Sequence, residues 1–134
     1  MKSESFFDGS GNLVARVVDF DSIQKGVFFH SEKIDTLQIA TSSYGSGERV
    51  QNHTHKMLER NIQTTSEVLI ILKGDGLLKI FDKDRKISHE INFGSSQIIS
   101  LFGGSHGLEF SESTTLIEIK QGPYMSEFED KIKW

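Results

Sequence analysis

The sequence predicts an all-β fold in which one domain forms a sandwich or barrel of short strands. Apolar, β-branched and aromatic runs recur along the chain, and turn signals such as Gly74-Asp75-Gly76 separate them. No stretch carries a sustained helical period of apolar residues, and the best helical candidate is the short segment 56–63. A chain of 134 residues is close to the commonest size of a single domain and long enough for one core.

The predicted strands follow one another along nearly the whole chain. In chain order they lie near residues 13–20, 26–30, 35–42, 48–55, 67–73, 77–82, 86–93, 96–102, 106–111 and 114–120. Alternation along the fourth strand places His53 and His55 on one face. The fifth strand is apolar on both faces beyond Glu67, which predicts burial on both sides. On the last strand Glu118 and Lys120 share a face, and strand ion pairs are usually found in solvent.

The aromatic residues and the remaining histidines have simpler interpretations. The ten phenylalanines are most simply core residues. Phe28 and Phe29 are adjacent, so one of them could point outward and line a contact with a second copy. His89 alternates with polar neighbours, which favours a solvated strand position over a chemical role.

Composition narrows the class of protein. With a net charge of −4 and a pI near 5.7, the chain has no positive electrostatic field that would attract nucleic acid or an anionic membrane. No apolar run approaches the roughly 20 residues that span a bilayer, and the first residues lack the pattern of a secretory signal. We therefore expect a cytoplasmic protein. The absence of cysteine removes disulfides, thiolate metal sites and cysteine nucleophiles.

The most informative motif is His53-Thr54-His55. Two imidazoles two positions apart on a strand point the same way and can grip one metal ion from one side. Glu67 opens the next apolar strand, and His106 follows a second glycine-rich turn. These four side chains supply three nitrogens and a carboxylate, which suits a divalent ion such as iron, manganese, nickel or zinc.

The order of these residues resembles the two motifs of the cupin superfamily. The resemblance rests on Gly47, His53, His55, Glu67, Gly74, Gly94 and His106. It implies a single domain over residues 1–134 with the double-stranded β-helix of that family, a jelly-roll β-barrel. Residues 35–124 would form the barrel, residues 1–34 would supply N-terminal strands, and residues 125–134 would be a C-terminal tail. The family's metal ligands carry over onto His53, His55, Glu67 and His106.

The chain departs from the family pattern between the second histidine and the glutamate. The intervening segment, 56–66, is longer than usual by about eight residues. Glu59 sits at the family's usual spacing and competes with Glu67 for the ligand role. We prefer Glu67 because strand geometry directs its side chain. The choice between the two carboxylates and the identity of the metal stay open.

The end of the chain suggests a pathway context. Residues 116–124 resemble the closing segment of the WbuC-type cupins, which are associated with surface-polysaccharide and sugar biosynthesis. This implies Lewis-acid chemistry of an isomerase or epimerase type on a carbohydrate or sugar nucleotide, with Glu59 or Tyr44 moving the proton. The alternatives are an Fe(II)-dependent dioxygenase and a non-catalytic sugar-binding module.

Self-association is the last expectation. Open antiparallel sheets expose strand edges that proteins cover or pair. We expect a homodimer formed by the apolar segments Leu13–Val18 and Val27–Phe29, as cupins often do.

Overall fold

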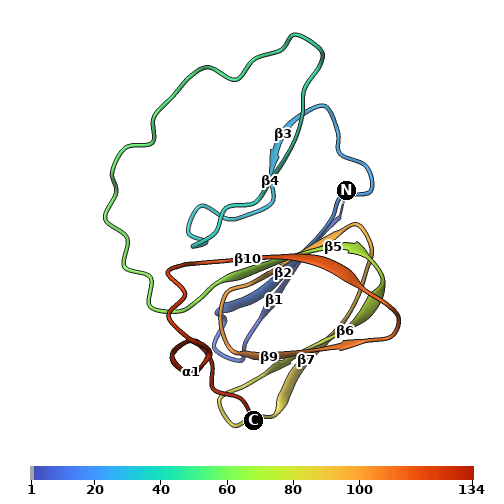
Figure 1. Ribbon diagram of the computed structural model, residues 1–134, viewed down its shortest axis with the longest axis vertical. Coiled ribbons are helices and arrows are strands. Elements are labelled where there is room, and N and C mark those ends of the chain that lie inside the picture. Colours follow the sequence, from blue (N-terminus) through green and yellow to red (C-terminus); the bar gives the residue numbers. More distant parts are fainter. Residues whose placement is uncertain (1) are drawn as a thin grey trace.

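The computed structural model describes residues 2–134 as an antiparallel β-sandwich with a separate two-stranded ribbon (Figure 1). The elements are β1 (Ser3–Phe7), β2 (Leu13–Asp19), β3 (Gly26–Phe29), β4 (Ala40–Ser43), β5 (Glu67–Lys73), β6 (Asp75–Phe81), β7 (Ile87–Gly94), β8 (Gln97–Leu101), β9 (Ser105–Phe110), β10 (Thr115–Lys120) and α1 (Glu127–Asp130). The prediction of an all-β fold is confirmed. Most predicted strands lie within a residue or two of the observed ones.

Two open sheets make up the sandwich. The large sheet has the strand order β1-β2-β8-β5-β10, and the small sheet has the order β7-β6-β9. The ribbon β3–β4 lies outside them, and all pairings are antiparallel. Over residues 2–134 the strands do not close into a barrel.

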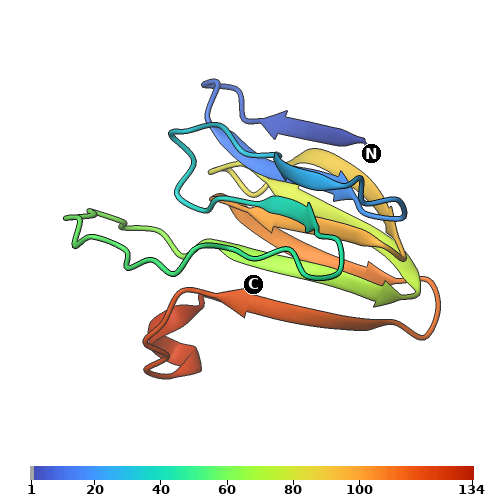
Figure 2. The ribbon, with the colours of Figure 1, turned by 90° about the horizontal axis from the view of Figure 1, so that it is seen from above.

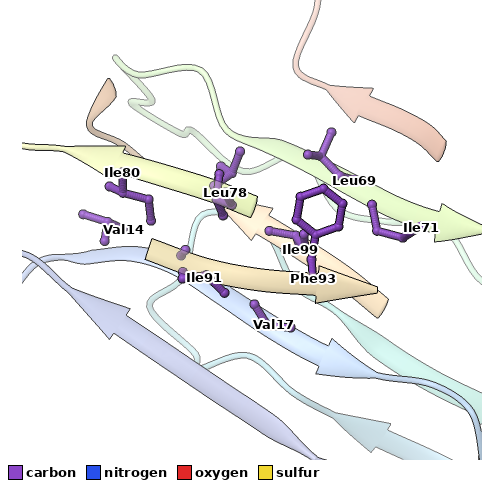
Figure 3. Packing of buried hydrophobic residues seen from close by; sticks show 11 residues of the cluster. Val14, Val17, Leu69, Ile71, Leu78, Ile80, Ile91, Phe93 and Ile99 are labelled. Carbon is purple, nitrogen blue, oxygen red and sulfur yellow. The ribbon is translucent and has the colours of Figure 1, made fainter. Parts of the chain in front are cut away.

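The core lies between the two sheets (Figure 3). Its buried members are Val14, Ala15, Val17, Leu69, Ile71, Leu78, Ile80, Ile91, Phe93, Ile99 and Leu101. Alternation along β5 and β8 turns one side chain in two toward this layer, as the pleat of a strand requires. Each fully buried aliphatic side chain of this kind stabilises the fold by about 1.5–3 kcal/mol.

A glycine makes the tight turn between β5 and β6 possible, where the chain passes from the large sheet to the small one. Gly74 separates the two strands and has a φ of 100°, a region that L side chains rarely adopt. A Cβ at this position would also overlap Thr114. Any other residue here would have to disturb the turn that follows β5.

The outer face of the large sheet is covered over β2 and β8. Arg16 on β2 forms an ion pair with Asp35 at 2.7 Å, and the two side chains are only 7% and 5% exposed. Ile39 is buried, and the hydroxyl oxygens of Thr36 and Ser66 lie 3.2 Å apart. The irregular segment 30–39 is thus held against the sheet by one buried ion pair and a buried apolar side chain.

Residues 44–66 contain no strand or helix, so the predicted strand 48–55 and the helical candidate 56–63 are both wrong. Figure 1 shows this segment, in green, looping away from the sheets. Every residue from 44 to 65 is exposed. A strand needs a neighbour to satisfy its backbone and an apolar face to bury, and the run 49–55 offers only Val50 for burial.

Several assignments of apolar residues also need correction. Leu13–Val18 belongs to β2, which pairs with strands on both sides and is largely buried, so it cannot offer a dimer edge. Phe28 and Phe29 are exposed, and Phe93 is the one phenylalanine among the described side chains that is fully buried. The outer face of β5 is only partly covered, with Leu72 exposed.

The structure adds two elements that the sequence did not reveal, β1 and the helical turn α1. β1 has three polar residues followed by Phe6 and Phe7, and Phe6 packs edge-on against His89 with ring centroids 5.7 Å apart. His89 is therefore half-buried rather than solvated. Among the described residues no helix has the length and apolar character needed to cross a membrane.

Candidate functional site

A groove of about 980 Å³ opens at one end of the sandwich. Its walls come from the end of the loop at 63–65, the first residue of β5, the end of β6, the turn and strand 103–109, and the C-terminal residues 130–134. The groove therefore lies where both sheets and the C-terminal segment meet. It is polar and charged on several sides, unlike the core behind it.

Glu67 and His106 form the central pair of this groove. His106 Nε2 lies 3.1 Å from Glu67 Oε2, and the two side chains are 32% and 11% exposed. Glu67 comes from the large sheet, where it lies next to the buried residues Leu69 and Ile71 on the inner face of β5. His106 comes from β9 of the small sheet, opposite Ile80. The pair thus bridges the two sheets at their open end.

The hydrogen bond from His106 lowers the pKa of Glu67 below the ordinary value of a glutamate. Burial opposes this shift, while the positive charges of Lys120 and Lys131 reinforce it. The carboxylate is therefore ionised at neutral pH although its side chain is nearly buried. A charged acceptor held beside an imidazole is a combination that proton transfer uses.

Lys120 connects Glu67 to the C-terminal segment. In the register of β10 with β5, Lys120 lies directly opposite Glu67, and Glu118 opposite Leu69. Residues directly opposite in an antiparallel pair share a face, so the charged face of β10 is the inner one. Lys120 Nζ lies 3.1 Å from a carboxylate oxygen of Asp130 and 3.5 Å from one of Glu118. The expectation that Glu118 and Lys120 both point to solvent is wrong for Lys120, whose side chain is 20% exposed.

The C-terminal segment supplies an aromatic wall that the sequence did not reveal. The rings of Trp134 and Phe81 meet edge-on at 4.8 Å, and the guanidinium carbon of Arg85 lies 4.9 Å from the Trp134 ring. Lys79 of β6 pairs with Glu109 of β9 on the same side. Residues 130–134 of the predicted C-terminal tail 125–134 therefore line the site. The one signal in the sequence was a lone tryptophan beside two lysines.

The other sequence-predicted site residues lie on the exposed loop. His53 and His55 have ring centroids 5.1 Å apart, and His53 Nδ1 lies 2.9 Å from the carbonyl oxygen of Gln51. Tyr44 and Glu59 are exposed on the same loop. The structure brings Glu67 to His106 and His53 to His55, but it does not bring the two pairs together.

As placed, these residues do not make a metal centre. Over the described part of the chain, no three side chains of histidine, cysteine, aspartate or glutamate gather closely enough to hold an ion. Glu67 and His106 supply two of the four expected ligands, and the other two lie on the loop.

Comparisons with protein-family models, with curated proteins and with solved structures found no match to this chain.

Proposed function

We propose that the groove binds a small, hydroxyl-rich ligand of the carbohydrate class and that Glu67 and His106 exchange protons with it. The observation that carries the proposal is the 3.1 Å contact between the Glu67 carboxylate and His106 Nε2 inside the groove. The hydrogen bond from His106 and the nearby positive charges hold Glu67 ionised, so it can accept a proton from a ligand hydroxyl or from a carbon beside a carbonyl group. His106 can return a proton to a nearby oxygen, which is what isomerisation or epimerisation of a sugar requires.

The rest of the groove suits the same class of ligand. Lys79, Glu109 and Asp130 supply donors and acceptors for hydroxyl groups. Trp134 and Phe81 offer apolar surface to the C–H face of a sugar ring. Polar groups converging on a concave site with one apolar wall are typical of small-molecule sites.

Titration with free monosaccharides and uridine-diphosphate sugars, followed by NMR shifts and calorimetry, tests the proposal. Glu67→Gln and His106→Gln should each weaken binding by about 10- to 100-fold, because each removes one hydrogen bond to a charged group. Glu90→Gln on β7 is the matched control and should bind like the wild type. If the NMR shift changes caused by the sugars were confined to the loop 44–65, the groove would not be the binding site. Binding without turnover would assign the chain to the alternative class of non-catalytic sugar-binding modules.

A second candidate is the metal-binding cupin, with its jelly-roll fold and its cytoplasmic location. In its favour, Glu67 and His106 are already in contact, and Thr64 and Thr65 at the end of the histidine-bearing loop line the same groove. A divalent ion there would require the loop to carry His53 and His55 onto the groove.

Metal content decides this candidate. Protein purified without added metal should hold close to one equivalent by elemental analysis, and the double variant His53→Ala, His55→Ala should lose most of it. Glu67→Gln should reduce the metal content more than Glu59→Gln. The opposite order would assign the ligand to the loop. Bound iron together with oxygen uptake in the presence of substrate would favour the dioxygenase alternative.

A further inference from the structure

The edge strand β10 differs from the other sheet edges in what it exposes. β1 exposes Ser3 and Glu4 besides its last residue, Phe7, and β7 exposes Ser88, Glu90 and Asn92 besides its first residue, Ile87. β9 borders the groove. Polar and charged residues of this kind discourage an edge from pairing with another strand. β10 carries no such protection on its outer face.

The outer face of β10 is apolar and uncovered. Ile117 and Ile119 are 46% and 54% exposed. They lie directly opposite Ile70 and Val68 of β5, which are half-buried, and Leu72 of β5 is 51% exposed. The segment 30–39 covers the β2–β8 half of this same face and leaves the β5–β10 half open.

The backbone edge of β10 is also accessible. In the part of the chain that the structure describes, β10 pairs with β5 alone and ends the large sheet. Figure 2 shows β10, in orange, at the border of the sheet, with α1 past its C-terminal end. The N–H and C=O groups on this side of the strand have no strand to bond to.

We propose that β10 pairs antiparallel with β10 of a second copy, so that the two large sheets become one continuous sheet. The pattern around Glu118 is palindromic, because an isoleucine stands on each side of it. A two-fold axis through Glu118 places Ile117 of each copy opposite Ile119 of the other on the outer face. Lys120, whose Nζ lies 3.5 Å from Glu118 within each copy, offsets the like charges that meet at the axis. Only pairing with itself uses this palindrome, which is why the occupant is a second copy and not another peptide.

Sedimentation velocity of the full chain at micromolar concentration is the first test. The wild type should sediment as a dimer, and Ile117→Lys with Ile119→Lys should weaken self-association by about tenfold or more, because lysines of the two copies would stand directly opposite each other across the new strand pair. Ile87→Lys is the matched control, since Ile87 is 51% exposed near the start of the edge strand β7. A monomeric wild type overturns the proposal. So does a dimer that Phe29→Lys dissociates and the β10 variant does not, because the ribbon β3–β4 would then be the interface.

Cysteine cross-linking tests the register independently. The chain has no cysteine, so Glu118→Cys provides a single thiol. Opposite residues in an antiparallel pair have Cα atoms about 4.5–5.5 Å apart, within the range that a disulfide spans. Mild oxidation should link Glu118→Cys into a covalent dimer and leave Ser88→Cys on β7 monomeric. Equal cross-linking of both variants would show random collision and overturn the proposal.

Discussion

Two irregular segments flank β4, and the sandwich holds only one of them. Residues 30–39 lie against the large sheet, held by the Arg16–Asp35 pair and by buried Ile39. Residues 44–66 extend from the sheets, with every side chain from 44 to 65 exposed. Both segments lack regular structure, so secondary structure does not explain the difference. What differs is whether a side chain reaches a partner that is itself buried.

The comparison extends to the two histidine-containing pairs. Glu67 and His106 stand on strands whose neighbours are core residues, so their directions are set by the pleat. His53 and His55 stand on the exposed stretch 44–65, whose contacts with the rest of the protein include Glu48 with Lys25 and Thr64 with Phe102, near its two ends. The strand-borne pair is therefore organised before any ligand arrives, and the loop-borne pair is not.

Breaking the buried ion pair should have the largest effect. Asp35→Ala leaves the Arg16 guanidinium buried without its partner, which costs about 3–5 kcal/mol of the free energy of unfolding. Urea denaturation measures the loss. Asp21→Ala, at an exposed position, is the control and should change the stability by less than about 0.5 kcal/mol. Equal stability of the two variants would mean that the segment 30–39 is not held by this pair.

Truncating one apolar side chain in each segment should give the second-largest difference in stability between the two segments. Ile39→Ala removes a buried side chain and should cost about 2–4 kcal/mol. Leu58→Ala, on the exposed loop, should change the stability by less than about 0.5 kcal/mol. Thermal and urea denaturation of both variants give the comparison. A matching loss at Leu58 would show that the loop packs against the sandwich in solution.

Glu67 should contribute a pH-dependent stability of about 1–3 kcal/mol, the range for a hydrogen bond to a charged group. Its pKa in the folded protein lies below the ordinary 4.5, so the contribution is complete above that pH and is lost as the pH falls through the lowered value. The difference in unfolding free energy between the wild type and Glu67→Gln should therefore shrink as the pH falls from about 5 through the lowered pKa of Glu67. A difference that grows below about pH 5 would contradict the lowered pKa.

The smallest effect is expected at the loop histidines. The double variant His53→Ala, His55→Ala should alter the metal-free unfolding free energy by less than about 0.5 kcal/mol, because both side chains are exposed. Differential scanning fluorimetry in the presence of a chelator measures it. A loss greater than about 1 kcal/mol would place the histidines in a packed contact and remove the contrast with Glu67 and His106.

Most of the strands could be predicted from the sequence, because alternation, β-branched residues and turn glycines are local signals. The turn at Gly74 is the clearest case, since its position follows from one left-handed glycine between two apolar runs. Glu67 and His106 were also found as candidate site residues from their place beside those strands. The start of β5 at Glu67 could be predicted from the same apolar run.

Features that depend on a distant partner could not be predicted from the sequence. The run 48–55 alternates like a strand, but no strand of the described residues pairs with it. The backbone N–H and C=O groups of an unpaired strand can bond only to water. Alternation of side chains along the strand predicts that Glu118 and Lys120 share a face. The pairing of Lys120 with Glu67 shows that this face is the inner one. The Arg16–Asp35 pair joins residues 19 positions apart on opposite sides of the ribbon strand β3. Such contacts depend on which distant segments the fold brings side by side, and the local sequence does not specify this.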